Sequence, residues 1–453
     1  MTRRLHRDWL TLVLLALVVR GGVLAARFES LGLDPDAYRR LAVNVVGHGV
    51  LGHGEVPSAF RPPLYPLLVA ACEIVSRDDR WALAALHLGA GVATVLLTCH
   101  LGRRWGLAGW AWAAALAVAI DPLLLMQSTL VMTETVAALL AVVSLATVTW
   151  YGKNTTWRRA AAAGASIGLA ALCRPTFLPW AAAMAGWLVI ENLSSKSAGE
   201  SKPSGGTAAG RMIVPQWIKG VADAVALLVG VFIVMSPWAI RNQIRFGKPI
   251  LATTHGGYTL LLGNNPSFYE YLRSGGWGEV WWSDELDAEL GRRLTSGQPG
   301  DELRNDRLAY DEAKRNIRRE PAMFLYASLV RVGRLWSVLP HQVSEGESAF
   351  GRLTRYSVGV WYTAVLGLAA VGVVAIGRQS FGISPAAVRG WIAAMLLVLS
   401  FTAVHAVYWT DMRMRAPLMP AVAMAAAAGL RRLREGGGPR AGGSRLGSGS
   451  ESR

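Results

Sequence analysis

Carboxylates and arginines recur at a few positions beside long apolar segments of the sequence. An acidic pair, Asp34 and Asp36, is followed by Arg61, which stands before two prolines, and Glu134 lies just inside an apolar run. A carboxylate can accept the proton of a reacting hydroxyl or bind a metal ion, and an arginine can bind phosphate. Charged groups beside a membrane core are costly and mostly functional, so these residues are the first candidates for a site.

The composition indicates a membrane protein. Of the 453 residues, 52% are hydrophobic and 17% are charged, whereas about a quarter are charged in an ordinary soluble domain. The net charge of +16 comes from lysines and arginines between apolar runs and at the chain ends, which is typical of topology signals and argues against nucleic acid as a partner. Cys72, Cys99 and Cys173 lack metal-ligand spacing and are expected to pack in apolar surroundings.

Ten apolar runs approach the roughly 20 residues that a helix needs to cross a bilayer. They cover residues 9–26, 81–101, 107–125, 133–150, 160–173, 176–190, 219–238, 356–376, 388–408 and 416–430. The runs lack the period-2 alternation of a barrel strand. We therefore expect an all-α polytopic membrane protein of about ten transmembrane helices.

Basic residues predict the orientation of these helices. Arg3, Arg4 and Arg7 place the N-terminus inside, and alternation then puts every short basic loop inside, including residues 431–434. This agreement requires that the short apolar segment at residues 64–75 does not cross, which favours an interfacial or re-entrant helix. We expect a multi-pass protein of the plasma (inner) membrane with both termini cytoplasmic.

The pattern divides the chain into four parts. Residues 1–240 are predicted to form a transmembrane module with a first outer loop at 28–80 and a flexible inner linker at 194–210. Residues 241–355 form a polar and interfacial outer region, in which residues 321–339 are expected at the membrane interface and Trp277, Trp281 and Trp282 could stack on a sugar or lie among lipid headgroups. Residues 356–434 form the last transmembrane helices, and residues 435–453 a disordered tail.

The outer segments resemble a known family. The acidic pair ahead of Tyr38, followed by Arg61 before Pro62-Pro63-Leu64-Tyr65, is similar to the GT-C glycosyltransferases that use polyprenyl-phosphate sugars, which include protein O-mannosyltransferases and the lipid A aminoarabinose transferase. Further matching motifs are Leu130-Val131-Met132-Thr133-Glu134-Thr135, Arg174-Pro175, Pro237-Trp238-Ala239-Ile240-Arg241-Asn242, Gly263-Asn264-Asn265-Pro266 and Arg413-Met414-Arg415-Ala416-Pro417-Leu418. The resemblance covers nearly the whole membrane part and implies a GT-C-like fold.

The resemblance implies three catalytic carboxylates. In the family, the first acidic residue of the loop is the general base, and Asp34, four residues before Tyr38, matches it. Asp36 is the second candidate, but it is also well placed to cap the helix expected at residues 37–46. Glu134 matches an acidic residue near the acceptor or a divalent ion, and helix capping is its alternative role.

The resemblance also implies a site for the lipid phosphate of the donor, whose charge grows as the glycosidic bond breaks. Arg61 matches a position where relatives more often have Lys, and a snorkelling side chain at a helix start is its alternative. The other candidates lie at outer helix ends, where they could instead be boundary anchors: Arg174, Arg241, Arg413 and Arg415.

A metal ion is left open by the sequence. Mg²⁺ or Mn²⁺ could be bound by the three carboxylates with His48 or His53. The spacing is not diagnostic, and arginines alone can neutralise a single lipid phosphate. Both histidines lie beside glycines and are more typical of exposed turns.

These features predict an inverting glycosyltransferase that moves a sugar from a polyprenyl-phosphate carrier to a lipid, glycan or protein hydroxyl at the outer face of the membrane, surrounded by membrane lipids. Inversion and the carrier are implied by the resemblance. A transporter or lipid flippase also has many helices, but it tends to carry charges deep in the bundle. A catalytically inactive assembly factor of the same fold would keep the helices and would not need Asp34.

Overall fold

The computed structural model of the chain describes residues 2–76, 78–153, 155–194, 215–275, 280–294, 301–341, 346–378 and 384–435. Three features expected from the sequence lie outside these residues: nearly all of the linker at 194–210, the tail beyond Glu435, and Trp277. The statements below concern the described part of the chain.

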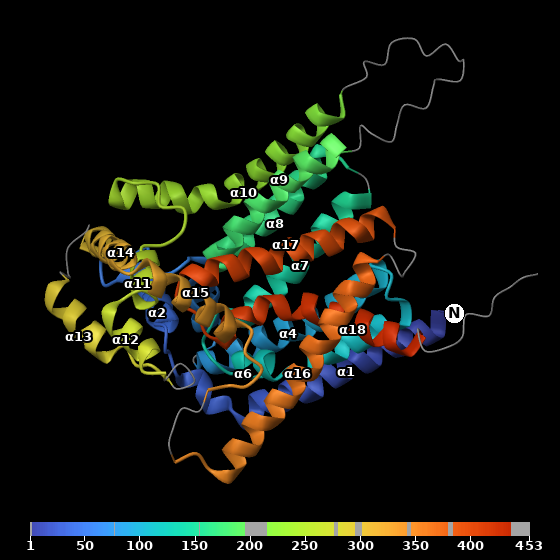
Figure 1. Cartoon of the computed structure of the whole chain (residues 1–453), viewed down its shortest axis with the longest axis horizontal. Coiled ribbons are helices and arrows are strands. Elements are labelled where there is room, and N and C mark those ends of the chain that lie inside the picture. The colour runs from blue at the N-terminus through green and yellow to red at the C-terminus, as the bar shows by residue number, and fades with distance from the viewer. Residues whose placement is uncertain are drawn as a thin grey trace, which may run out of the picture.

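Long helices form one bundle (Figure 1). They are α1 (Thr2–Ala26), α4 (Asp79–Arg104), α5 (Ala111–Ala119), α6 (Pro122–Ser128), α7 (Glu134–Lys153), α8 (Trp157–Cys173), α9 (Leu178–Ser194), α10 (Gln216–Phe246), α16 (Ala349–Gly377), α17 (Pro385–Val407) and α18 (Met419–Glu435). Short 3₁₀ turns join or precede some of them: η2 (Ala108–Trp110), η3 (Pro175–Phe177) and η5 (Met412–Leu418). Nine of the ten predicted runs each lie mainly on one of these helices, and the run at 107–125 is divided between α5 and α6. The predicted all-α membrane fold is confirmed.

Fewer helices than the ten predicted runs are long and apolar enough to cross a membrane. By length and apolar composition, six described helices can each cross a membrane: α1, α4, α7, α10, α16 and α17. The pair formed by residues 108–119 and α6 makes a seventh if it is one bent span. The helices α8, α9 and α18 have 17 residues each, just below the length required by this test. The count of ten therefore stays a prediction.

The bend between α5 and α6 has a local cause. The two helices differ in direction by 49°. Asp121 lies at the break and accepts the backbone N–H of Leu124, and Pro122 follows as the first residue of α6. Such a cap with a proline at the first helical position starts a new helix rather than continuing the old one. Tyr362 of α16 donates to Asp121 at 3.0 Å, which fixes the break to the bundle.

Small residues let the helices approach closely. A Cβ atom on Gly164 of α8 would collide with the backbone carbonyl of Leu227 in α10, and one on Gly372 of α16 would collide with that of Ala425 in α18. Close backbone contact through small residues is the common way in which membrane helices pack, because lipid gives no hydrophobic drive for their association.

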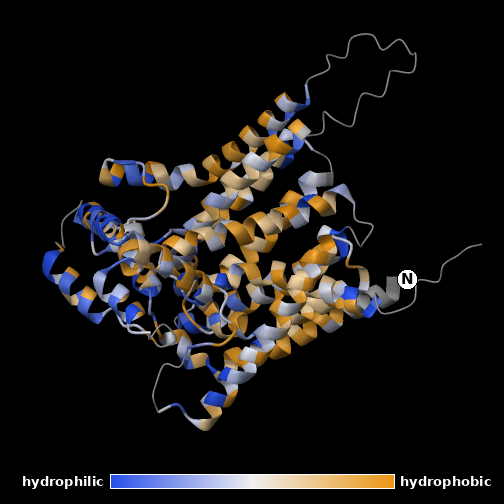
Figure 2. Ribbon diagram, in the orientation of Figure 1, coloured by the Kyte–Doolittle hydropathy of each residue, from blue (hydrophilic) through white to orange (hydrophobic). Residues whose placement is uncertain are grey.

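Short elements gather at one end of the bundle, around α2 and α11 to α15 (Figure 1). From the first outer loop come η1 (Phe28–Gly32), α2 (Tyr38–His48), the two-residue strands β1 (Gly52–His53) and β2 (Val56–Pro57), and α3 (Leu64–Val75). From the later region come α11 (Gly256–Leu262), α12 (Pro266–Arg273), α13 (Asp284–Arg293), α14 (Asp301–Arg319) and α15 (Pro321–Leu335). Figure 2 shows these later helices to be far more hydrophilic than the bundle. The beginning of α1 and the end of α18 lie at the opposite end (Figure 1).

Helix α15 is shorter than the helix predicted at residues 321–339, and its expected place at the membrane interface stays a prediction. It ends at Leu335, and Arg331 is buried, donating from Nε to the carbonyl of Ala406 in α17 and from Nη1 to that of Gly263. The helix therefore packs against protein on this face, although Leu325 and Leu329 on another face are exposed. Arg331 is buried because it binds backbone carbonyls of two other segments, and the sequence of α15 alone does not reveal these partners.

Candidate active site

The two aspartates before α2 have different partners. Asp34 accepts the backbone N–H groups of Arg39 at 3.1 Å and Arg40 at 2.9 Å, so its carboxylate caps the first turn of α2. Ala37 between them has a φ of 60°, which is unusual for a residue with a side chain. The expectation that Asp36 is the cap is therefore wrong, and Asp36 is free to point elsewhere.

Asp36 lies between two arginines. Its Oδ1 is 3.2 Å from Arg61 Nη2, and its Oδ2 is 3.6 Å from Arg413 Nη1. Arg61 also donates from Nε to the backbone carbonyl of Asp36 at 3.1 Å, and its guanidinium lies over the rings of Tyr38 and Phe60. These contacts join the first outer loop to η5, more than 350 positions later in the sequence.

A second ion pair lies at the adjoining helix ends. Glu134, the first residue of α7, places Oε1 3.1 Å from Nη1 of Arg174, which follows α8. Glu134 is 1% exposed. Arg174 also directs Nη2 to the sulfur of Met414 at 2.7 Å. The carboxylate is thus paired with an arginine. Ser128, a capping partner considered from the sequence, donates its hydroxyl to the carbonyl of Leu125 instead.

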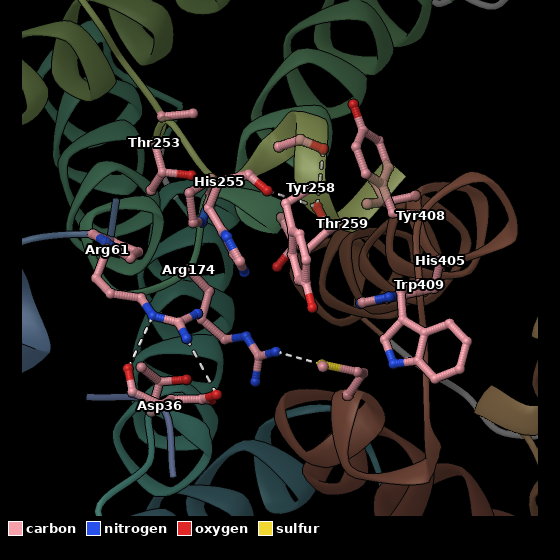
Figure 3. A pocket seen from close by; sticks show the side chains of 18 of the residues that line it. Asp36, Arg61, Arg174, Thr253, His255, Tyr258, Thr259, His405, Tyr408 and Trp409 are labelled. Carbon is pink, nitrogen blue, oxygen red and sulfur yellow. Dashed lines mark hydrogen bonds and ion pairs between the residues drawn. The ribbon is translucent and has the colours of Figure 1, made fainter. Parts of the chain in front are cut away.

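A cavity of about 780 Å³ brings five of the eight predicted site residues together. Its lining includes Asp36, Arg61, Glu134, Arg174 and Arg413. Figure 3 shows Arg61 directed at Asp36, with Arg174 beside them. Asp34, Arg241 and Arg415 do not line this cavity.

The two arginines outside the cavity have structural partners. Arg241 near the end of α10 donates to the carbonyls of Leu51 at 2.7 Å and Ser58 at 3.0 Å, so it ties α10 to the first outer loop. Arg415 is fully buried and donates to the carbonyls of Leu335 and Ser337, with its guanidinium 4.2 Å from the ring centre of Tyr362. Both arginines hold backbone segments in place.

A further part of the cavity lining is aromatic and was not expected from the sequence. It consists of His255, Tyr258, Tyr310, Tyr408 and Trp409, which we call the aromatic wall. In the view of Figure 3, His255 lies near Arg61, Tyr258 lies beside His255, and Tyr408 and Trp409 lie farther from Arg61. Burial, and to a smaller extent the charge of Arg61, lower the pKa of His255 to about 3. Burial also raises the pKa of Tyr38, on the charged side, to about 12. Both groups are therefore neutral near pH 7.

Trp281 and Trp282 of the predicted tryptophan cluster do not line the cavity. Trp281 packs behind the aromatic wall, with ring centres 5.4 Å from Trp409 and 5.2 Å from Phe268, while Trp282 is largely exposed. The signal that could have found the wall is the density of aromatic residues and histidine at residues 255–258 and 405–409. It becomes a site only because α11 and the end of α17 meet, where Trp409 N–H donates to the carbonyl of Thr259.

The candidate metal ligands do not form a metal site. No group of three or more His, Cys, Asp or Glu side chains in the described part of the chain is placed to hold one ion. Both oxygens of Asp34 accept backbone amides, whereas Asp36 and Glu134 are paired with arginines. His48 and His53 are exposed at the edge of the first outer loop.

Comparison with known proteins finds one matching family and several solved structures with a similar fold. Residues 60–218 match the dolichyl-phosphate-mannose-protein mannosyltransferase family. The fold is similar to that of the oligosaccharyltransferase AglB from Archaeoglobus fulgidus, both in complex with an inhibitory peptide and a dolichol-phosphate (17% identity, TM-score 0.52) and in the apo form (17% identity, TM-score 0.53). Each match covers 95% of this chain and 50% of the AglB chain, so this chain spans about half the length of that protein.

A further match is ArnT from Cupriavidus metallidurans bound to undecaprenyl phosphate, with 15% identity, a TM-score of 0.39, and coverage of 94% of this chain and 78% of that chain. No curated protein matches the chain. The match over residues 60–218 and the likeness in fold to AglB support the resemblance found in the sequence.

Proposed function

We propose that this protein is a membrane glycosyltransferase that takes a sugar from a polyprenyl-phosphate carrier and transfers it to a hydroxyl of a lipid, glycan or protein. The observation that carries the proposal is the convergence of Asp36, Arg61, Glu134, Arg174 and Arg413 in one cavity. Asp36 and Arg61 come from the first outer loop, Glu134 and Arg174 from two helix ends, and Arg413 from η5, near the other end of the sequence. Three cations and two carboxylates leave an excess of positive charge, which suits the phosphodiester of such a donor.

The arginines are suited to the leaving group. When the bond between the anomeric carbon and the phosphate oxygen breaks, its electrons go to the oxygen and the polyprenyl phosphate gains a negative charge. Guanidinium groups that already face the cavity stabilise this charge without reorganisation. Arg174 and Arg413 both line the cavity. Arg174 is paired with Glu134, and Arg413 is paired with Asp36 and, through Nε, with Asp411.

Asp36 is the general base of this proposal. The acceptor oxygen attacks the anomeric carbon, and its proton passes to a carboxylate within hydrogen-bond reach. Asp36 lines the cavity and its side chain is 24% exposed. Asp34, which matches the base of the family by its spacing from Tyr38, has both oxygens engaged with the backbone of α2. We assign it to positioning: its cap fixes the turn that carries Asp36. A single displacement of this kind inverts the anomeric carbon.

The proposed location is the plasma (inner) membrane, with the cavity on the outer side and both termini in the cytoplasm. Its test is an introduced cysteine at Glu285→Cys, an exposed position of α13. We expect it to react with a membrane-impermeant maleimide in intact cells. Labelling only after the cells are opened would reverse the orientation.

The function is tested by sugar transfer with the purified chain in lipid nanodiscs. The assay offers a panel of undecaprenyl-phosphate sugars with a membrane lipid extract and peptides as acceptors, and it measures the release of free undecaprenyl phosphate. We expect release by the wild type and a loss of 10²-fold or more, roughly, in Asp36→Asn. Asp284→Asn, an exposed carboxylate of α13, is the matched control. If no donor is consumed, or if Asp36→Asn is fully active, the proposed reaction or its base is abandoned.

A further inference from the structure

The cavity is divided into a charged half and an uncharged half. The ion pairs of Asp36 and Glu134 form the first, and the aromatic wall forms the second. The lining contributed by residues 252–262, 310 and 404–409 includes no carboxylate, ammonium or guanidinium group. A ligand that reaches from the arginines to the wall therefore meets two different chemical environments.

Two aromatic side chains of the wall are held in place by neighbouring side chains. Tyr258 donates its hydroxyl at 2.8 Å to Asp287, which does not line the cavity, and its ring stacks on His255 with centres 5.1 Å apart. Trp409 is supported from behind by Trp281 and Phe268. Flat aromatic faces of this kind bind the apolar faces of sugar rings.

Three uncharged side chains of the cavity lining carry polar atoms without a partner. Nδ1 of His255, both ring nitrogens of His405 and Oγ1 of Thr176 are buried and have no hydrogen-bond partner in the described part of the chain. A buried polar group without a partner is costly, and a ligand hydroxyl that satisfies it gains affinity. His255 is neutral near pH 7 because burial lowers its pKa. These atoms therefore suit neutral hydroxyl groups.

We infer that the aromatic wall is a subsite for a neutral sugar ring and discriminates against sugars that carry a carboxylate or an ammonium group. A carboxylate or ammonium group buried among these residues would find no counter-charge on them, and that costs far more than burying hydroxyl groups that find partners. The ring belongs either to the donor, next to its phosphate, or to a glycan acceptor. This inference rests on the proposed function for the position of the phosphate at the arginines.

The test measures equilibrium binding to the full chain in nanodiscs. The probes are bare undecaprenyl phosphate and undecaprenyl phosphate carrying glucose, mannose, galactose, arabinose, glucuronic acid or glucosamine. We expect at least one neutral sugar to tighten binding roughly tenfold over the bare carrier. The charged sugars should bind no more tightly than the bare carrier. If the ring belongs to the acceptor, neutral methyl glycosides should instead bind to the complex with the bare carrier, and charged ones should not.

Variants of Tyr258 attribute the effect to the wall. Tyr258→Leu should lose the gain that the sugar adds and keep the affinity for the bare carrier. Tyr258→Phe should restore that gain, because the ring is retained. Tyr326→Leu, at an exposed tyrosine of α15, is the matched control. Binding of the bare carrier is measured separately. If the bare carrier does not bind, the proposed function is abandoned, and the selectivity for neutral sugars is judged from the methyl glycosides alone. A charged sugar that binds as tightly as its neutral counterpart, or no added affinity from any sugar in either arrangement, would overturn the inference.

Discussion

Glu134 Oε1 lies 3.1 Å from Arg174 Nη1, and this contact joins the first residue of α7 to the residue that follows α8. The pair is asymmetric. The side chain of Glu134 is 1% exposed, whereas that of Arg174 is 12% exposed and reaches the cavity. The carboxylate thus depends on the arginine for its neutralisation, while the arginine can also meet an anionic ligand.

This asymmetry predicts unequal effects on stability. Arg174→Gln leaves a buried carboxylate without its counter-charge and should destabilise the protein by about 3 kcal/mol or more. Glu134→Gln removes the charge that needs neutralising and should cost only about 1 kcal/mol. The measurement is thermal unfolding of the purified variants in detergent, with the double variant included. A larger loss for Glu134→Gln than for Arg174→Gln would contradict the asymmetry.

The cap of α2 separates the two candidate bases. Asparagine keeps one of the two acceptor oxygens that Asp34 uses, so Asp34→Asn should keep part of the cap of α2 and retain transfer activity within about tenfold. Asp34→Ala loses the cap, at about 1 kcal/mol, and should lower activity further because Asp36 is no longer held in place. Transfer assays and hydrogen exchange of the Arg39 and Arg40 amides follow the two effects. A 10²-fold loss, roughly, in Asp34→Asn with an intact cap would make Asp34 the base.

Helix α14 positions the cavity through one carboxylate. Glu302 Oε1 accepts the backbone N–H of Ala59 at 2.8 Å and the hydroxyl of Thr254, so it joins the first outer loop to the segment before α11. Glu302→Gln should weaken both contacts and lower kcat/KM about tenfold, because a misplaced loop carries Arg61 out of register. Glu312→Gln, on the same helix and paired at the surface with Arg293, is the control. Equal activity of the two variants would remove the positioning role.

The charged half of the site could be found from the sequence, and the aromatic half could not. Asp36, Arg61, Glu134, Arg174 and Arg413 stand out because a charge beside an apolar run is costly and needs a reason. That reasoning cannot tell a ligand-binding arginine from one that binds backbone carbonyls, as Arg241 and Arg415 do, because the carbonyls come from distant segments.

Local geometry limited the prediction in the same way. Which of Asp34 and Asp36 caps α2 depends on the left-handed backbone of Ala37, which neither the spacing nor the residue types reveal. The apolar runs were located correctly as helices. Hydropathy alone did not predict the bend at Asp121 or the 17-residue lengths of α8, α9 and α18, and these features decide how the helices cross. The aromatic wall needs α11 to meet the end of α17, a tertiary contact.

His255 predicts how stability depends on pH. Its pKa is lowered to about 3 in the folded protein, mainly by burial, from an ordinary value of 6.5. Between these values the unfolded chain binds a proton that the folded protein does not, so stability is complete above pH 6.5 and is lost as the pH falls towards 3. At pH 4.5 the loss from this one group is at most about 2.7 kcal/mol. In His255→Asn, which cannot be protonated, the melting temperature should fall less between pH 7 and pH 4.5 than in the wild type. His48→Asn, at the exposed end of α2, is the matched control. Equal falls in the wild type and His255→Asn would mean that His255 is already protonated in the folded protein.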